Sequence, residues 1–202
     1  MNIAAREPGG WQAQKSVATR QLIVEATLRC LVELGLKRTT THAIATQAGL
    51  SRGALLHHFP AKADALGAAA GLLYRNRLQL LARRLEARFP GGPERSHALT
   101  ESLWQHYRDG SFAGVLELEL AARTDRALAA ALAPARESYA HDWRHAVRSA
   151  LPATAGSGVV TDAALDALRA ALEGLALARA AGGSDAPAPV LRELERLLGV
   201  GR

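Results

Sequence analysis

The stretch "GLSRGALLHHFPAK", residues 49–62, gathers several side chains that could do chemistry within a short span. The adjacent histidines His57 and His58 could ligate a metal ion or transfer protons. Ser51 could serve as a nucleophile. Arg52 and Lys62 could instead bind an anion such as a phosphate group. The surrounding sequence has to decide between a metal site, a catalytic site and an anion-binding surface.

Metal binding and catalysis are the less favoured of these hypotheses. Neighbouring helical residues point about 100° apart, so His57 and His58 seldom hold one ion, and no cysteine or acidic residue follows three or four positions later. Two further pairings, Ser51 with His57 and Asp142 with His145, show neither a nucleophile elbow nor a recognisable acid–base spacing. We therefore expect no metal, no cofactor and no enzymatic activity.

Charge and composition favour a polyanionic partner. The chain has 202 residues and a formal charge of +6, of which the first 62 residues carry eight basic and three acidic side chains. Such a basic end joined to a nearly neutral remainder is typical of nucleic-acid binding, although ordinary surface scatter gives the same count. Cys30 is the single cysteine, and the sequence has neither a signal-type apolar core nor a long uncharged apolar run. We expect a cytoplasmic protein with no membrane partner.

Leucine, alanine, arginine and glutamate dominate, and runs of more than three β-branched residues are absent, which predicts an all-α protein. Glycine and proline clusters at 89–93, 152–158 and 182–189 are expected to be loops. Apolar periodicity and capping residues place the helices between them. The expected helices span residues 16–34, 40–48, 52–59, 62–88, 94–108, 112–123, 125–151, 162–181 and 190–198.

Residues 41–59 have the layout of a helix-turn-helix unit, in which a glycine-containing turn joins two short helices. Ile44 and Leu55 would pack inward, Ala45 is small where the helices approach, and Gly49 supplies the permissive turn. The second helix of such a unit enters the major groove of DNA. Helical pairs of this kind also occur in bundles that bind no DNA, so the layout alone leaves both interpretations open.

The segment "TRQLIVEATLRCLVELGLKRTTTHAIATQAGLSRGALLHHFPAKADAL", residues 19–66, resembles the TetR family of bacterial transcriptional regulators. Its residues match the family pattern at fixed spacing and without gaps. The matching positions are Thr19, Arg20, Ile23, Ala26, Leu28, Gly35, Thr39, Ile44, Ala45, Ala48, Gly49, Ser51, Gly53, Leu55, His58, Phe59, Lys62 and Leu66.

The resemblance implies which residues contact double-stranded DNA. Thr40 and Thr41 would hold a phosphate at a helix start, and Arg52 is the best candidate for reading a guanine. Lys62 would bind a phosphate together with the positive end of the following helix. The full expected set is Thr40, Thr41, His42, Arg52, Gly53, Ala54, Leu56, His57, His58 and Lys62.

Three positions depart from the family pattern. Leu56 replaces the usual tyrosine, Ala54 replaces threonine or serine, and Ala43 replaces the acid that completes a capping box. These changes leave the affinity and the preferred DNA sequence open. Arg20 is expected either to add general phosphate attraction or to be a solvated surface residue.

The resemblance also implies a C-terminal region that binds a small-molecule effector and forms a homodimer. Polar and aromatic side chains among apolar helices are the effector-pocket candidates. We expect them at Trp104, Tyr107, Arg108, Arg123, Tyr139 and Trp143. The expected dimer seam comprises Leu168, Leu172, Leu175, Ala176, Arg179 and Leu194, which could equally be the core of one chain.

These expectations describe an all-α regulator with a flexible arm at 1–15, a DNA-binding domain at 16–62 and an effector and dimerisation domain at 63–202. We expect a dimeric repressor that its effector releases from a palindromic operator. The alternative is a ligand or protein sensor of the same fold that binds DNA weakly or not at all.

Overall fold

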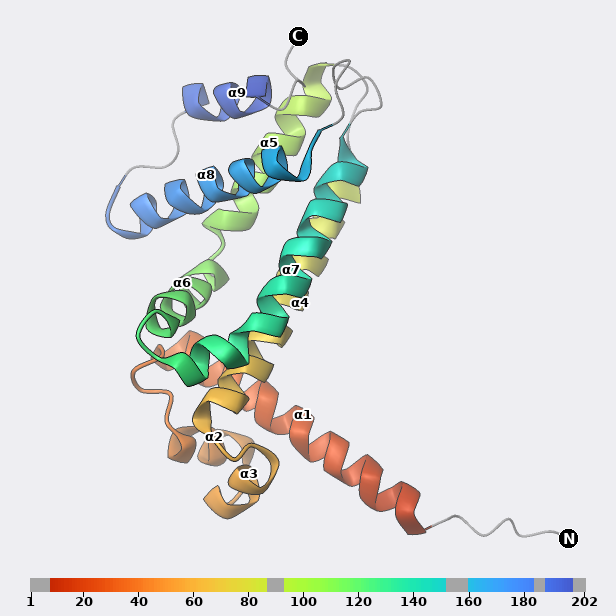
Figure 1. Ribbon diagram of the computed structural model, residues 1–202, viewed down its shortest axis with the longest axis vertical. Coiled ribbons are helices and arrows are strands. Elements are labelled where there is room, and N and C mark those ends of the chain that lie inside the picture. Colours follow the sequence, from red (N-terminus) through yellow and green to blue (C-terminus); the bar gives the residue numbers. More distant parts are fainter. Residues whose placement is uncertain (1–7, 87–92, 152–159, 184–187, 198–202) are drawn as a thin grey trace, which may run out of the picture. The chain divides into compact units, whose positions relative to one another are not determined.

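The computed structural model describes residues 8–86, 93–151, 160–183 and 188–197, and every regular element in these ranges is an α-helix (Figure 1). The expected all-α fold is confirmed. In chain order the helices are α1 (Pro8–Leu34), α2 (Thr41–Ala48), α3 (Arg52–His58), α4 (Lys62–Glu86), α5 (Pro93–Arg108), α6 (Ser111–Ala122), α7 (Arg126–Ala150), α8 (Asp162–Ala180) and α9 (Ala188–Leu197).

The chain divides into two compact units, which we call the head and the body. The head comprises residues 1–73 and 117–133, and the body comprises residues 74–116 and 134–202. Helices α4, α6 and α7 each contribute to both units. The chain passes from head to body within α7 at Pro134, whose missing N–H removes one helical hydrogen bond. The expected division after Lys62 stays a prediction. By its internal contacts, the head continues along α4 to Leu73.

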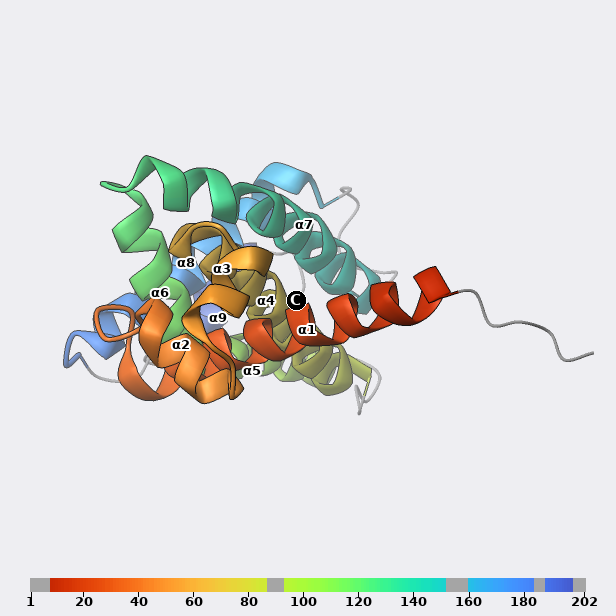
Figure 2. The same ribbon diagram turned by 90° about the horizontal axis from the view of Figure 1, so that it is seen from below.

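Most helix boundaries lie within two residues of those expected, and the exception is the start of α1. This helix begins at Pro8 rather than at Ser16. Proline suits the first position of a helix because its missing N–H would have no partner there. The expected arm at 1–15 therefore includes helical residues from Pro8 onward, while 1–7 lie outside the described residues. The first turns of α1 extend past α2 and α3 (Figure 2). The expected loop at 152–158 and most of that at 89–93 lie outside the described residues.

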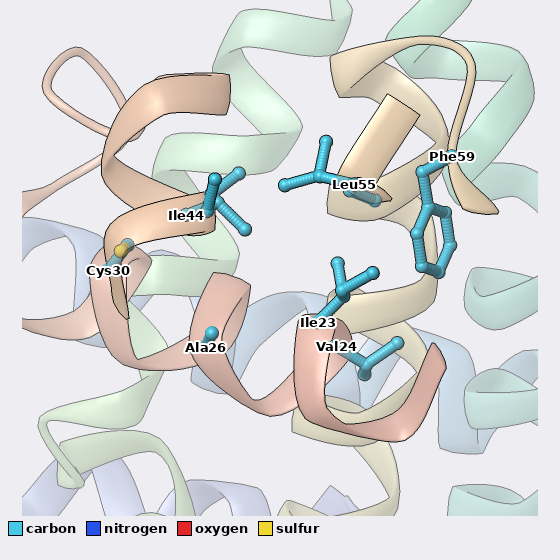
Figure 3. Close-up of a cluster of buried hydrophobic side chains, with 9 residues drawn as sticks. Ile23, Val24, Ala26, Cys30, Ile44, Leu55 and Phe59 are labelled. Atoms are coloured by element: carbon cyan, nitrogen blue, oxygen red, sulfur yellow. The ribbon is translucent and has the colours of Figure 1, made fainter. Parts of the chain in front are cut away.

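The head is held together by an apolar core between α1, α2, α3 and the first turns of α4. The side chains of Ile23, Ile44, Leu55 and Phe59 are all fully buried and point toward one another (Figure 3). Burial of such residues stabilises the folded state by roughly 1.5–3 kcal/mol each. This core fixes α3 against α1 and α2 and leaves its outer face to solvent.

Residues 117–133 are attached to the head by two contacts. The carboxylate of Glu117 accepts a hydrogen bond from the backbone N–H of Leu36 at 2.6 Å, in the turn between α1 and α2. Gly67 of α4 lies so close to α7 that a Cβ atom there would be 2.5 Å from the carbonyl oxygen of Ala131. The end of α6 and the start of α7 are therefore built into the head.

The core of the body lies between α5, α7, α8 and α9. On α8 the buried residues recur with helical spacing, at Leu165, Leu168, Leu172 and Ala176. Trp104 of α5 and Trp143 of α7 are among the largest buried side chains. Within the described ranges, no helix combines the length and the apolar character needed to cross a membrane.

Candidate nucleic-acid interface

Helix α2 and the turn after it are fixed by local hydrogen bonds. The Thr40 hydroxyl caps α2 by accepting from the backbone N–H of Ala43 at 3.1 Å. Gly49 ends the helix with a φ of +67°, a left-handed conformation that glycine adopts without strain. The N–H of Leu50 then reaches back to the Ala45 carbonyl at 2.9 Å, which completes a Schellman motif. The angle at which the chain enters α3 follows from this turn.

Helix α3 begins with a cap of the same kind. The Ser51 hydroxyl accepts a hydrogen bond from the N–H of Ala54 at 3.1 Å. In the structure Ser51 therefore starts the helix. Phe59 ends α3 in an extended conformation, and Pro60 follows.

The C-terminal end of α3 is held by Arg20, for which the sequence predicts only phosphate attraction or a place on the solvated surface. Its guanidinium lies over the ring of Phe59, 4.1 Å from the centroid, and donates a hydrogen bond to the His58 carbonyl at 2.9 Å. Arg20 therefore links α1 to the last turn of α3, and a cation over an aromatic ring adds to the attraction. We infer that Arg20 positions α3. No short-range sequence signal marks it, because its partners lie 38 residues away.

The structure brings most of the expected DNA-contacting residues onto the start of α2, the outer side of α3 and the start of α4, whereas Leu56 packs against the apolar core of the head. Arg52, Gly53 and His57 of α3 are exposed, as are Thr40 and His42. The remaining expected contacts are partly buried, namely Thr41, Ala54, Leu56, His58 and Lys62. Lys62 is the first residue of α4, where Asp64 accepts from the N–H of Ala61 at 3.0 Å and strengthens the helix start.

Of the paired histidines, His57 is exposed on this surface and His58 is partly buried. The rings of His57 and His58 are 5.3 Å apart in an edge-on arrangement with an interplanar angle of 75°. Over the part of the chain that the structure describes, no group of three histidine, cysteine, aspartate or glutamate side chains could hold a metal ion. The other pairing considered, Asp142 with His145, consists of two exposed residues on α7.

Comparison with known proteins agrees with this helix-turn-helix geometry. Residues 23–69 match the family model described as bacterial regulatory proteins of the tetR family. An HTH-type transcriptional regulator of Mycobacterium tuberculosis is 31% identical over 142 residues, which are 70% of this chain and 71% of that protein. The chain belongs to the TetR family. It is therefore a DNA-binding transcriptional regulator.

Solved structures of TetR-like regulators share the fold. A transcriptional regulator from Streptomyces coelicolor A3(2) superimposes with a TM-score of 0.69 at 21% identity, covering 89% of this chain and 98% of that one. The multidrug binding protein EbrR, solved with ethidium, gives a TM-score of 0.63 at 22% identity over 89% of this chain and 98% of its own. At this level of identity the likeness concerns the fold alone.

Four of the six effector-pocket candidates of this TetR-family chain lie in the interior of the body. Trp104, Tyr107, Tyr139 and Trp143 are each less than a tenth exposed. Arg108 is partly buried at the end of α5. Arg123 belongs to the head and is exposed in the turn after α6, so the structure does not include it in the body interior.

The body interior also contains polar groups that sequence reasoning missed, above all Arg77 and His106. Arg77 is 2% exposed and His106 is 1% exposed. A signal for Arg77 exists in hindsight, because it stands on the apolar stripe of α4, four residues after Leu73 and four before Leu81. A charged residue at an inward-facing position of a helix indicates a buried polar site.

A shallow hollow of about 320 Å³ lies between the last turns of α4 and α7. Its lining is Ala82, Leu85, Glu86, His145, Ala146, Ser149 and Ala150. None of the expected effector-pocket residues borders it.

Most of the expected dimer seam is buried within the single chain. Leu168, Leu172, Ala176 and Leu194 are all less than a tenth exposed and belong to the body core. Leu175 is partly buried and Arg179 is exposed. The periodicity of α8 predicts an apolar stripe correctly, but a stripe covered by the same chain and one covered by a second copy have the same spacing. The opposite face of α8 is exposed and carries Ala167, Gly174 and Leu177.

Proposed function

We propose that the protein is a dimeric repressor that a small-molecule effector releases from a palindromic operator. The observation that carries the proposal is the outer face of α3, where Arg52, Gly53 and His57 are exposed while Leu55 and Phe59 anchor the helix from below. A helix held in this way presents its N-terminal residues rigidly to the major groove. Repression by blocking a promoter requires nothing beyond DNA binding itself.

The exposed residues fall into two groups by their chemistry. One group would contact the bases of DNA, and the other would bind its phosphate backbone. Arg52, at the start of α3, has a guanidinium that can donate two parallel hydrogen bonds to O6 and N7 of one guanine. Lys62 and Thr40 stand at the N-terminal ends of α4 and α2, where backbone N–H groups and the helix dipole favour a phosphate. Arg52 would therefore specify the sequence, and Lys62 and Thr40 would hold the backbone.

Dimerisation would place two such units about one turn of DNA apart, roughly 34–36 Å. The exposed face of α8 is suited to this contact. Gly174 has no atom within 4 Å of an added Cβ, and Leu177 is 46% exposed. Small residues on such a face allow two helices to approach closely. The homodimer seam is therefore proposed on this face rather than on the buried one.

Effector binding would act by shifting a population between two states of the dimer, only one of which fits the operator. Support comes from EbrR, a multidrug binding protein of similar fold that has been solved with ethidium and with proflavin. In this chain we propose the body, with its buried aromatic side chains, as the effector-binding region.

A mobility-shift titration with the DNA upstream of the protein's own gene tests the DNA-binding part. Arg52→Ala should weaken binding by roughly 1–3 kcal/mol and relax the preference at one base position. Lys62→Ala should weaken binding to all sequences and reduce the salt dependence by about one unit of slope. Arg29→Ala, at an exposed arginine of α1 outside the expected interface, is the matched control and should bind like the parent.

Equal binding by the parent and both variants would show that the assigned surface is wrong. Absence of any DNA binding by the parent would favour the alternative, a sensor of the same fold. The dimer is tested separately by sedimentation of Leu177→Arg, which should be monomeric where the parent is dimeric. Val17→Arg, at an exposed valine of α1, should leave the association unchanged. A monomeric parent would refute the dimer.

A further inference from the structure

A buried arginine without a carboxylate partner lies in the interior of the body. Arg77 of α4 donates to the Ser111 hydroxyl at 2.8 Å and to the His106 carbonyl at 3.0 Å. Its guanidinium lies 5.8 Å from the ring centroid of Tyr107 and 5.3 Å from that of Phe112. No described carboxylate forms an ion pair with it. All of its close partners are therefore neutral oxygens and aromatic rings.

The other ionisable groups around Arg77 do not pair with it directly, although, against the effect of burial, hydrogen bonds from Ser111, with Arg77 and Arg84 nearby, lower the pKa of Asp109. Asp109 accepts from the backbone N–H of Ser111 at 2.9 Å, and the carboxylate of Glu173 pairs with Arg169 at 2.9 Å. Burial, with Arg77 and Arg84 nearby, holds the pKa of His106 well below its ordinary value, so its imidazole is neutral. A buried cation that lacks a counter-charge is costly to maintain. Arg77 therefore lacks a direct counter-ion among the described residues.

Three further groups in the body lack a hydrogen-bond partner of good geometry among the described residues. They are the Tyr107 hydroxyl, the indole N–H of Trp143 and Nε of Arg169. Indole and guanidinium nitrogens only donate, and a tyrosine hydroxyl can donate. Buried polar groups are normally hydrogen-bonded, so an interior with unused donors is short of acceptors. An anionic group with acceptor oxygens would supply both a direct counter-ion for Arg77 and the missing hydrogen-bond acceptors.

Aromatic rings lie close to the Arg77 guanidinium and to Tyr107. Tyr139 donates to or accepts from His106 at 2.7 Å, and its ring stacks on that of Tyr74 with centroids 4.8 Å apart. Tyr107 and Phe112 meet edge to face at 5.3 Å. Burial raises the pKa of Tyr107 and of Tyr139, so both hydroxyls stay protonated and able to donate. Flat apolar walls of this kind suit an aromatic body.

We propose that the body interior binds an aromatic carboxylate, whose anionic group pairs with Arg77 and accepts from the Tyr107 hydroxyl. The proposal rests on the proposed effector-dependent function and adds the chemical class of the effector. It excludes a cation such as ethidium or proflavin from this site, because Arg77 would repel it and the orphan donors would stay unsatisfied. The ligand class would therefore differ from the dyes found with EbrR.

The same contacts connect the ligand to the backbone. Arg77 ties the last turn of α5, through the His106 carbonyl, to the first residue of α6, through Ser111. A carboxylate on the guanidinium competes with both bonds and loosens the junction between the two helices. The cluster is closed in this structure, with Arg77, His106, Tyr107 and Tyr139 all less than a tenth exposed. Binding thus selects a more open state of the body.

Isothermal titration of the full chain with 2-naphthoate and with its neutral isostere 2-naphthamide tests the proposal, and proflavin serves as the cationic probe. The acid should bind at least about tenfold more tightly than the amide, the difference expected for a charge-assisted contact. Arg77→Gln should bring the ratio of the two affinities close to one, while Arg77→Lys should keep part of it. Arg75→Gln, at an exposed arginine of the same helix, should keep the parent ratio.

Tyr107→Phe provides a second variant should Arg77→Gln fail to fold, because it removes one hydroxyl and keeps the ring. It should lower the acid affinity about threefold to tenfold and leave the amide unchanged. The proposal is overturned if the acid does not bind, if proflavin binds more tightly than the acid, or if the acid-to-amide ratio survives both substitutions. Operator binding is measured without either probe, so a protein that binds DNA but no acid refutes only this inference. One that binds the acid but no DNA refutes only the repressor.

Discussion

The head and the body use polar side chains in opposite ways. In the head, Arg52 and His57 lie on the surface above an apolar core of Ile44, Leu55 and Phe59. In the body, the polar groups are inside, with Arg77 buried among aromatic rings. A surface cation keeps its hydration, whereas a buried one gives it up and depends on the atoms around it. The head therefore exposes charged side chains to solvent, whereas the body buries Arg77 away from it.

Because of this contrast, substitutions are expected to affect stability and function separately in the head but together in the body. Substitution of an exposed residue on α3 removes a contact with DNA and leaves the fold nearly unchanged. Substitution inside the body alters folding and ligand preference together, because the same atoms serve both.

Phe59→Ala should destabilise the protein by about 3–5 kcal/mol, the usual loss for a fully buried aromatic side chain. The substitution removes the ring from the head core and also the surface over which the Arg20 guanidinium lies. Guanidinium-chloride unfolding followed by circular dichroism measures the loss. Trp11→Ala is the control, since that aromatic side chain is 67% exposed and should cost less than about 0.5 kcal/mol. Equal losses for the two variants would contradict an apolar head core.

Gly67→Ala should destabilise the head by about 1–3 kcal/mol, as expected for overpacking. The added Cβ would stand 2.5 Å from the Ala131 carbonyl oxygen, and backbone atoms cannot move aside as a flexible side chain can. Alanine normally favours a helix over glycine, so a loss of stability here isolates the contact between α4 and α7. Thermal unfolding measures it. A variant more stable than the parent would show that residues 117–133 are not packed into the head.

The head could be predicted from sequence in more detail than the body. The bounds of α2 and α3 follow from Thr40, Gly49, Ser51 and Pro60, each of which acts on backbone atoms a few residues away. The start of α1 was missed because the expected start at Ser16 ignored Pro8, which fits a first helical position. These effects act over only a few residues, so they can be predicted from the sequence.

The body interior depends on partners far apart in the chain. Arg77 contacts groups 29 and 34 residues away, and nothing near it in sequence identifies them. The apolar stripe of α8 was predicted, yet its covering partner was not, because Leu168 and Leu172 would show the same spacing in a dimer seam as in a core. Tyr107 and Tyr139 are expected pocket residues by their type, while the charge of Arg77 beside them is visible only in the fold.

Acidification should weaken the body through His106. Burial, Arg77 and Arg84 hold the pKa of this histidine below its unfolded value of about 6.5, so the unfolded chain takes up the proton more readily than the folded one. The associated stability is complete above that pH and is lost as pH falls below it, by at most about 1.4 kcal/mol per pH unit. Unfolding free energies at pH 7.5 and 5.5 should differ more for the parent than for His106→Gln.

His141→Gln is the matched control for this measurement, because His141 is exposed on α7 and should leave the pH dependence of the parent unchanged. The carboxylates Asp109 and Glu173 are present in all three proteins, so they contribute equally to the comparison. A pH dependence that is the same in the parent and in His106→Gln would mean that protonation of this residue is not coupled to folding. The interior would then tolerate a charge that the buried Arg77 is expected to repel.

Gly53→Ala gives the smallest effect and separates the two roles of α3. A Cβ at this exposed position would meet only the Ser51 hydroxyl, at 3.9 Å, so alanine fits and should stabilise the helix by about 0.5 kcal/mol. Operator binding should nevertheless weaken by about 1 kcal/mol, since the methyl group intrudes where the backbone approaches DNA. Stability and affinity would thus change in opposite directions, which a defect in folding cannot produce. If affinity rose together with stability, Gly53 would face away from the DNA and the recognition surface would have to be centred on Arg52 and His57 alone.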